Sequence, residues 1–175
     1  MLTIVLIIFL LFALLMLFII SSAFFGFLIT RVPFVPTGAG DIKFIVEKLG
    51  ITPKDIFYDL GSGDGKVCLL INRLSGARCV GFELTTWTYL LSLIKSTGNH
   101  RLKFRHSDFF EANWSEASYV YGYLYPPLMG RVKEKFLKDC KPGSIAIIRD
   151  FPFPDLKPSE VFYMPKAHEI YLYRL

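Results

Sequence analysis

The stretch that decides the fold is residues 56–66, which read IFYDLGSGDGK. It starts with an apolar run typical of a buried strand and ends where a helical pattern of apolar residues begins. The glycines between them allow a tight turn and a close approach of the backbone to a ligand, although a plain turn also explains them. The stretch therefore predicts a strand at 56–60, a turn, and a helix at 66–74.

The same alternation continues along the chain. A strand at 78–84 is followed by a helix at 86–95 that ends near Gly98, and further elements are predicted as strands at 102–107, 119–124 and 144–149 and as a helix at 128–139. Before them, residues 41–49 form an amphipathic pattern with Asp41 as a plausible N-cap. Strands that alternate with helices indicate a parallel sheet with helical crossovers.

The end of the chain has a different character. Residues 161–164 and 168–174 are short, rich in aromatic residues and joined by Pro165-Lys166-Ala167, which predicts a β-hairpin added to the sheet. Seven strands with a final hairpin are the layout of class I methyltransferases. The expected fold is thus α/β, with a Rossmann-like seven-stranded class I methyltransferase sheet, a C-terminal antiparallel hairpin and one preceding transmembrane helix.

The first thirty residues carry no charged side chain, and all 35 charges fall in residues 31–175. About twenty apolar residues cross a bilayer as a helix. The apolar stretch is longer than a signal peptide usually has and lacks a basic start, so we expect an uncleaved anchor rather than a cleaved signal peptide.

The basic residues nearest to the span all follow it: Arg31, Lys43, Lys48 and Lys54. This asymmetry predicts a single-pass membrane protein whose catalytic domain faces the cytoplasm or an equivalent reducing compartment. The expected domains are an anchor at 1–30, a linker and cofactor-covering segment at 31–40, and a methyltransferase domain at 41–175.

Composition limits the function classes. The 20 Lys and Arg against 15 Asp and Glu give a net charge of +5, and the basic residues are scattered, which argues against a nucleic-acid partner. The three cysteines have no Cys-x-x-Cys spacing and the three histidines no metal spacing, so no metal is expected and the thiols are interpreted as small core residues.

Three acidic residues follow or end successive predicted strands. Asp59 is followed by Glu83 after 24 residues and by Asp108 after 25 more. The carboxyl ends of parallel strands form the crevice where open α/β sheets bind ligands. A carboxylate at the second position takes ribose hydroxyls, and one at the third could accept from an adenine amine. Because Lys66-Val67 stands where a Walker motif has Lys-Ser/Thr, a triphosphate site is disfavoured. A hydride cofactor stays open at this point, although the acidic turn would repel its pyrophosphate.

Residues 59–65 resemble motif I of the S-adenosylmethionine-dependent class I methyltransferases. The segments PFVPT, DLGSGDGK, GFELTTW, SDFF, VYGYLYPPLM and RDFPFP resemble, in order, those of the membrane-anchored protein-lysine methyltransferases that act on the ATP synthase c-subunit and the adenine nucleotide translocase. The likeness runs from about residue 33 to 158. Departures are Thr85-Thr86 where the family tends to have Asn-Pro, and Phe110 where it has Trp.

This resemblance implies a cofactor, S-adenosyl-L-methionine, and a set of residues that bind it. Asp59, Gly61 and Gly63 would hold its methionine end, Glu83 the ribose, and Asp108 with Phe109 the adenine side, while residues 33–37 would close over it. The full cofactor-binding set implied is Pro36, Thr37, Asp59, Gly61, Ser62, Gly63, Glu83, Leu84, Asp108 and Phe109.

Aromatic residues near the ends of the fourth and fifth predicted strands are candidates for a substrate channel: Tyr125, Pro126, Phe151 and Phe153. Phe151-Pro152-Phe153-Pro154 is equally explained as a rigid connection. Tyr125-Pro126-Pro127-Leu128 resembles the Asn-Pro-Pro-Tyr loop of methyltransferases that act on bases or glutamine, but it lacks the Asn that would hold a planar amine.

The predicted function is methyl transfer to a lysine side chain of a membrane or membrane-proximal protein. Two alternatives stay open at this point. One is methylation of a lipid or another amphiphile delivered from the bilayer, and the other is a catalytically silent, anchored cofactor-binding module.

Overall fold

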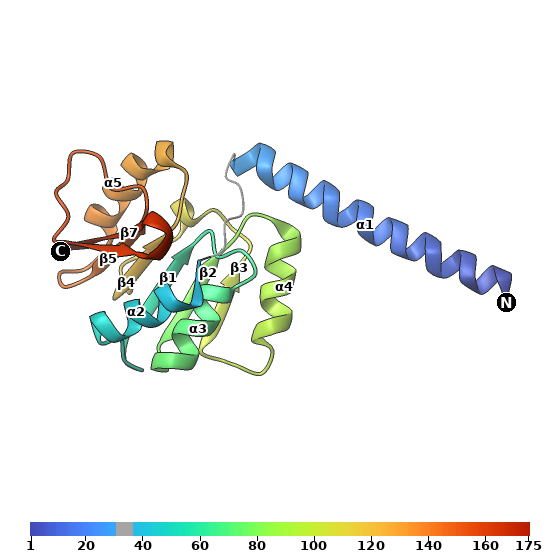
Figure 1. Ribbon diagram of the computed structural model, residues 1–175, viewed down its shortest axis with the longest axis horizontal. Helices are drawn as coiled ribbons and strands as arrows, with labels where there is room; N and C mark the ends of the chain where they lie inside the picture. Colours follow the sequence, from blue (N-terminus) through green and yellow to red (C-terminus); the bar gives the residue numbers. More distant parts are fainter. Residues whose placement is uncertain (31–36) are drawn as a thin grey trace.

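The computed structural model of the chain describes the backbone of residues 1–30 and 37–175 and the side chains of residues 1–22 and 37–175. A long amino-terminal helix, α1 (Leu2–Thr30), projects from a domain in which helices cover a sheet (Figure 1). Within α1, Leu2–Ser22 has a mean hydropathy of 3.4 and is long and apolar enough to cross a membrane, a property that signal sequences share.

The sheet has seven strands in the order β3-β2-β1-β4-β5-β7-β6. The first five are parallel: β1 (Ile56–Leu60), β2 (Arg78–Phe82), β3 (Leu102–Arg105), β4 (Tyr119–Gly122) and β5 (Ile145–Arg149). The hairpin of β6 (Glu160–Met164) and β7 (His168–Arg174) is antiparallel, with β7 beside β5. The predicted fold class and terminal hairpin are therefore confirmed.

Helices cover both faces of the sheet because alternate strand residues point to opposite sides. Phe57 belongs to a core cluster with residues of α2 (Ala39–Leu49) and α3 (Lys66–Ser75), whereas Tyr58 belongs to a cluster with residues of α5 (Met129–Asp139). Helix α4 (Thr86–Ser96) contacts β3. The three cysteines are buried and free, in agreement with their prediction as core residues.

Two predictions of detail are wrong. Strands β2, β3 and β4 end two residues earlier than expected, at Phe82, Arg105 and Gly122, so the residues that follow them are free to turn toward the edge of the sheet. Asp41 is not an N-cap, because α2 begins at Ala39 after Gly38, and Asp41 lies in the first turn with its carboxylate on Arg149 of β5. A tertiary ion pair has taken the place of the local capping bond.

Candidate functional site

The three acidic residues predicted from the sequence lie along the carboxyl edge of neighbouring strands. Asp59 is inside β1, Glu83 directly follows β2, and Asp108 comes three residues after β3. Across the sheet, Asp59 is in register with Gly81 of β2 and Tyr121 of β4. The topology thus brings acids that are far apart in the sequence to one edge of the sheet.

The turn between β1 and α3 requires its glycines. Gly61, Gly63 and Gly65 have φ angles of 74°, 54° and 81°, in the left-handed region that side chains disfavour. A Cβ atom on Gly65 would also lie 2.5 Å from Cζ of Phe104. The backbone N–H groups of Gly61 and Ser62 donate to the carbonyl of Phe82 at 3.0 and 2.8 Å, which ties the turn to the end of β2.

Glu83 is held by the backbone on both of its carboxylate oxygens. Oε2 accepts from the N–H of Gly63 at 2.8 Å, and Oε1 accepts from the N–H of Thr85 at 2.7 Å. An ionised carboxylate has about four acceptor positions. Glu83 therefore has a fixed orientation and still has acceptor capacity on each oxygen for hydroxyl groups of a ligand.

Asp59 is a buried acid whose pKa is raised from its usual value. Its pKa is raised to about 7, first because burial disfavours the charged carboxylate and then because Glu83 is nearby, while a hydrogen bond from Cys68 Sγ at 3.8 Å opposes the rise. A cation beside this carboxylate would favour its charged form. The position is suited to an ammonium group.

Asp108 and its neighbours form the third part of the edge. Asp108 Oδ1 accepts from the N–H of Phe110 at 2.8 Å and caps the short helix η1 (Phe109–Glu111). Phe109 is 8% exposed and packs against Trp114, so its ring belongs mainly to the core. Leu84 is half-buried, and its carbonyl is 2.8 Å from His106 Nε2.

The structure ties one end of the predicted cofactor-covering segment to the sheet. Thr37 is buried, and its hydroxyl is 2.7 Å from the hydroxyl of Tyr121. Because Tyr121 is in register with Asp59, Thr37 lies near the acidic edge. Pro36 lies outside the described residues, and so does the rest of the segment 33–36.

The predicted channel residues divide into two groups. Tyr125 and Pro126 are exposed after β4, and Phe151, 38% exposed after β5, stacks on Tyr123 with ring centroids 6.4 Å apart. Phe153 departs from the expectation. It is 3% exposed and packs between Phe136 and Tyr173, so it is part of the core and not of an open channel wall.

A charged cluster beside these aromatic residues was not predicted. Arg149 is 3% exposed, pairs with Asp41, has its Nε 3.8 Å from Asp150 Oδ2 and lies over the ring of Tyr123. Asp150 also accepts from the N–H of Glu169 and contacts His168 Nδ1, both at 2.9 Å. Burial alone would raise the pKa of Asp150, but these bonds outweigh it and lower that pKa. An arginine at the end of an otherwise apolar strand, IAIIR, is the sequence signal that points to this cluster.

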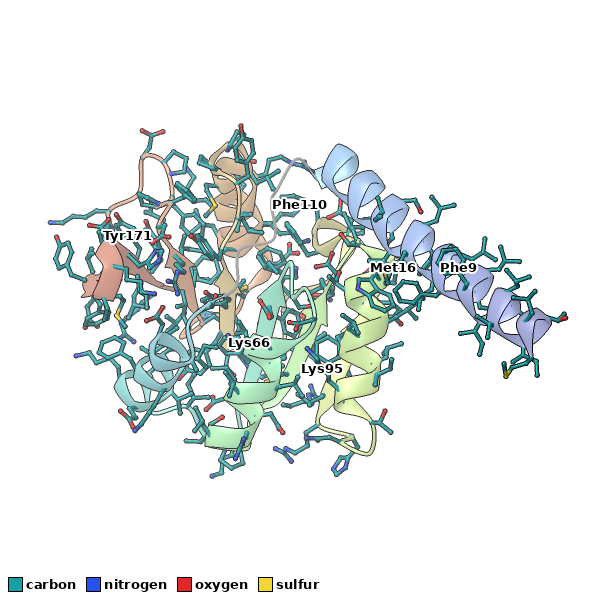
Figure 2. All side chains as sticks on the ribbon, turned by 45° about the vertical axis from the view of Figure 1, so that its right-hand side comes forward. Phe9, Met16, Lys66, Lys95, Phe110 and Tyr171 are labelled. Carbon is teal, nitrogen blue, oxygen red and sulfur yellow. The ribbon has the colours of Figure 1, made fainter. Side chains whose placement is uncertain are left out.

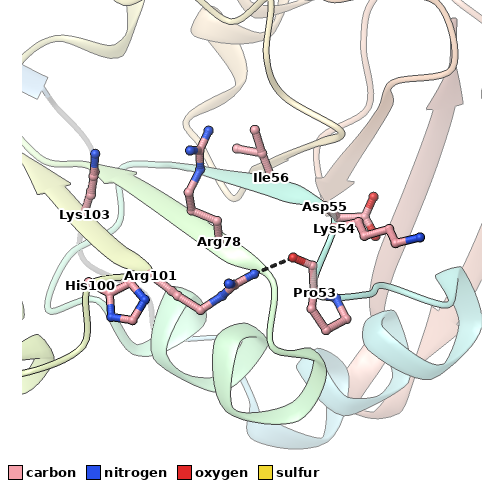
Figure 3. A pocket seen from close by; sticks show the side chains of 8 residues that line it. All are labelled: Pro53, Lys54, Asp55, Ile56, Arg78, His100, Arg101 and Lys103. Atoms are coloured by element: carbon pink, nitrogen blue, oxygen red, sulfur yellow. Dashed lines mark hydrogen bonds between the residues drawn. The ribbon is translucent and has the colours of Figure 1, made fainter.

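A hollow of about 390 Å³ lies at the opposite edge of the sheet (Figure 3). Its lining includes Lys54, Arg78, Arg101 and Lys103, at or near the amino ends of the strands, and Arg101 donates to the carbonyls of Pro53 and Gly76. This hollow therefore lies away from the three acidic residues at the carboxyl edge. We assign the site to the carboxyl edge, because its converging acids and glycine turn select a particular ligand.

The carboxylate acceptors of this edge fit S-adenosylmethionine, whose ammonium, ribose hydroxyls and adenine amine all need acceptors. The Ser62 hydroxyl is buried and has no hydrogen-bond partner among the described atoms. It packs against Gly81 and does not face solvent. In residues 1–30 and 37–175 no group of three His, Cys, Asp or Glu side chains could hold a metal ion. The absence of a metal cofactor stays a prediction.

Comparison with known proteins agrees with this geometry. The family model of the ANTKMT methyltransferase domain matches residues 59–160. A protein-lysine N-methyltransferase of Saccharolobus islandicus is 28% identical, with 83% of this chain and 94% of that protein covered. The human lysine N-methyltransferase of the ATP synthase c-subunit is 30% identical, with 74% of this chain but 56% of that protein covered. The chain therefore spans little more than half of the human relative.

Among solved structures, an RNA methyltransferase from Salinibacter ruber in complex with S-adenosyl-L-homocysteine superposes with a TM-score of 0.76. It is 27% identical, and the match covers 80% of this chain and 93% of that one. The resemblance to class I methyltransferases and the predicted cofactor are confirmed.

Proposed function

Because this chain belongs to the ANTKMT methyltransferase domain family, we propose that it transfers a methyl group from S-adenosylmethionine to a lysine side chain of a membrane or membrane-proximal protein. The observation that carries the proposal is the convergence of Asp59, Glu83 and Asp108 on the carboxyl edge of β1, β2 and β3, around a turn that requires glycine. The names of the archaeal and human relatives support lysine as the acceptor.

Each acid has its own task in this proposal. Asp59, whose buried carboxylate favours a neighbouring cation, holds the ammonium of the methionine moiety, with Gly61, Ser62 and Gly63 forming the backbone around it. Glu83 accepts from the ribose hydroxyls in the orientation fixed by Gly63 and Thr85.

The remaining residues of the cofactor-binding set contact the adenine side of the cofactor and cover it. Asp108, with Leu84 and Phe109 beside it, takes the adenine side. Pro36 and Thr37 cover the cofactor, and the bond from Thr37 to Tyr121 fixes the near end of that cover.

The cofactor supplies an activated methyl group on a positively charged sulfonium. The protein positions the acceptor in line with it and removes water from the lysine. A desolvated ammonium near a positive charge has a lowered pKa, so the lysine gives its proton to bulk solvent as it enters the site and needs no dedicated base. The aromatic faces of Tyr125 and Phe151, next to Pro126, contact the lysine side chain and its methylated product.

We also propose that α1 anchors the protein as a single-pass membrane helix, with the domain on the cytoplasmic or an equivalent reducing side. Its apolar span and the basic residues that follow it support this orientation. Anchoring raises the local concentration of a lysine that lies near the membrane surface. The domain bounds 1–30, 31–40 and 41–175 are part of this proposal.

The test is transfer of labelled methyl from S-adenosylmethionine by the detergent-purified full chain to membranes from a strain that lacks the gene. Label is counted in protein, lipid and RNA fractions, and methyl-lysine is sought after hydrolysis of the protein. Glu83→Gln should bind the cofactor at least about ten-fold more weakly, since one acceptor oxygen becomes a donor group. Glu116→Gln is the matched control, because Glu116 is exposed and pairs with Arg78 on the surface.

Methyl-lysine that disappears with Glu83→Gln but not with Glu116→Gln supports the proposal. Label confined to lipid would shift the assignment to an amphiphile, and label confined to RNA would shift it to a nucleobase. The Tyr125-Pro126-Pro127-Leu128 segment argues against the latter because it offers no amide acceptor for a base amine. Cofactor binding without any transfer would identify a silent module.

A further inference from the structure

Helix α4 has apolar side chains on its outward face. Leu90, Leu93 and Ile94 are 37%, 38% and 69% exposed, whereas Ser92 on the opposite side is fully buried. A cluster of three large apolar side chains on one face of a helix is an unusual feature of a surface that contacts only water. Something other than bulk water is expected to contact this face.

The amino end of α4 is in contact with α1. Ser22 Oγ accepts a hydrogen bond from the backbone N–H of Trp87 at 3.0 Å. Met16 and Ile19, six and three residues before Ser22 and on the same side of α1, are partly buried although most of α1 is exposed. Figure 2 shows Met16 beside α4 and Phe9 on the free half of α1.

This contact lies inside the apolar span itself. The described part of the span, Leu2–Ser22, has 21 residues and by itself can cross a hydrocarbon core of about 30 Å at about 1.5 Å per residue, and the apolar sequence continues to Ile29. Met16, Ile19 and Ser22 are in the last two turns of Leu2–Ser22. If Leu2–Ser22 crosses the hydrocarbon core, the first turn of α4 lies at the level of the membrane boundary.

The direction of α4 matters as well. Figure 1 shows α4 running across the direction of α1 rather than continuing along it. A helix that runs across a membrane-spanning helix is placed to present one of its faces to the membrane surface. Its first turn holds Trp87, a residue type favoured at the interface between lipid and water.

We propose that Leu90, Leu93 and Ile94 of α4 lie in the interfacial layer of a phospholipid bilayer beside the base of α1. The domain then touches the membrane through two helices, and rotation about α1 is prevented. Because Thr85 directly precedes α4 and Glu83 is three residues before its first residue, this contact holds the cofactor-binding edge close to the membrane surface. The inference rests on the membrane anchor of the proposed function and extends it.

The experiment places one accessible cysteine at a time in the full chain, because Cys68, Cys79 and Cys140 are buried. An environment-sensitive fluorophore is attached to Ile94→Cys, to Leu137→Cys and to Leu10→Cys, and each protein is reconstituted into phosphatidylcholine vesicles. Leu137, 47% exposed on α5, is the matched control, and Leu10, 58% exposed in α1, reports the anchor. Quenching by nitroxides on the lipid headgroup or deep in the acyl chain is then measured.

We expect headgroup nitroxides to quench the label at position 94 at least three-fold more than the label at position 137, and deep nitroxides to quench the label at position 10. Quenching at position 10 with equal, weak quenching at positions 94 and 137 would overturn the α4 contact and leave the anchor intact. Absence of quenching at all three positions would overturn the anchor and the inference with it. Methyl transfer by the same proteins to a water-soluble lysine peptide tests the catalytic proposal independently.

Discussion

Arg149 in β5 forms a buried ion pair with Asp41 in the first turn of α2, across 108 positions of the chain. The pair connects α2, which follows the cofactor-covering segment, to β5, which lies beside the terminal hairpin. Because α2 begins directly after Thr37 and Gly38, the position of that cover depends on a contact that is distant in sequence.

Removal of one partner should therefore destabilise the protein strongly. Arg149→Met leaves the Asp41 carboxylate buried and unpaired, and we expect a loss of about 3–5 kcal/mol in unfolding free energy by urea titration. The double variant Asp41→Asn/Arg149→Met should recover part of that loss. Lys43→Ala, which breaks an exposed pair with Glu47, should change stability by less than about 0.5 kcal/mol. Equal effects of Arg149→Met and Lys43→Ala would contradict the role of the buried pair.

Asp59 should make stability depend on pH. Its raised pKa of about 7 means that the folded state binds this proton more tightly than the unfolded chain, so stability falls as pH rises from about 4 to about 7. Without cofactor, the stability of Asp59→Asn relative to the parent should rise by about 2–3 kcal/mol between pH 5 and pH 8. Thermal unfolding at the two pH values measures this.

The same substitution should weaken cofactor binding at pH 8 by at least about ten-fold, since a charged partner of the ammonium is lost. Asp155→Asn, at an exposed position, is the control and should alter neither quantity. A stability gain for Asp59→Asn that is the same at pH 5 and pH 8 would show that the carboxylate charge is not its cause.

The glycine turn offers a test that separates backbone strain from crowding. Gly65 and Gly98 have nearly the same φ, 81° and 82°, but a Cβ would meet Phe104 at Gly65 and nothing within 4 Å at Gly98. Gly98→Ala should cost about 1 kcal/mol, and Gly65→Ala about 2–4 kcal/mol with loss of cofactor binding. Equal costs in denaturant titrations would remove crowding as an explanation.

Tyr125 should matter for turnover and not for cofactor affinity. It is 44% exposed and follows β4, outside the set of three acidic residues. Tyr125→Ala is expected to lower kcat by about ten-fold or more while the dissociation constant of the cofactor changes by less than two-fold. Calorimetric titration of the cofactor beside single-turnover kinetics distinguishes the two, and an equal loss of both would place Tyr125 at the cofactor.

Phe151 and Phe153 should differ although they are two residues apart. Phe153→Ala removes a core ring between Phe136 and Tyr173 and should cost about 3–4 kcal/mol of stability. Phe151→Ala, at the surface against Tyr123, should cost less than about 1 kcal/mol and reduce methyl transfer. If Phe151→Ala proved the more destabilising of the two, the division between core and channel would be incorrect.

The sequence by itself determined the order of strands and helices, the terminal hairpin and the acids at the strand ends. These features depend on local patterns: apolar periodicity, glycine where φ must be positive, and one acid in or after each of the first three strands. The glycines at 61, 63 and 65 were interpretable because no other residue adopts their φ angles at similar cost.

The tertiary structure alone decided what each side chain contacts. Asp41 had the pattern of a helix cap but pairs with Arg149, and Phe153 shared a motif with Phe151 but lies in the core. The contact of Ser22 with Trp87, which places α4 beside the apolar span, joins residues 65 positions apart. Such contacts depend on which helices and strands the sheet topology brings together. The free energy lost when a buried ion pair or a buried aromatic ring is removed exceeds the local conformational preference of a single residue.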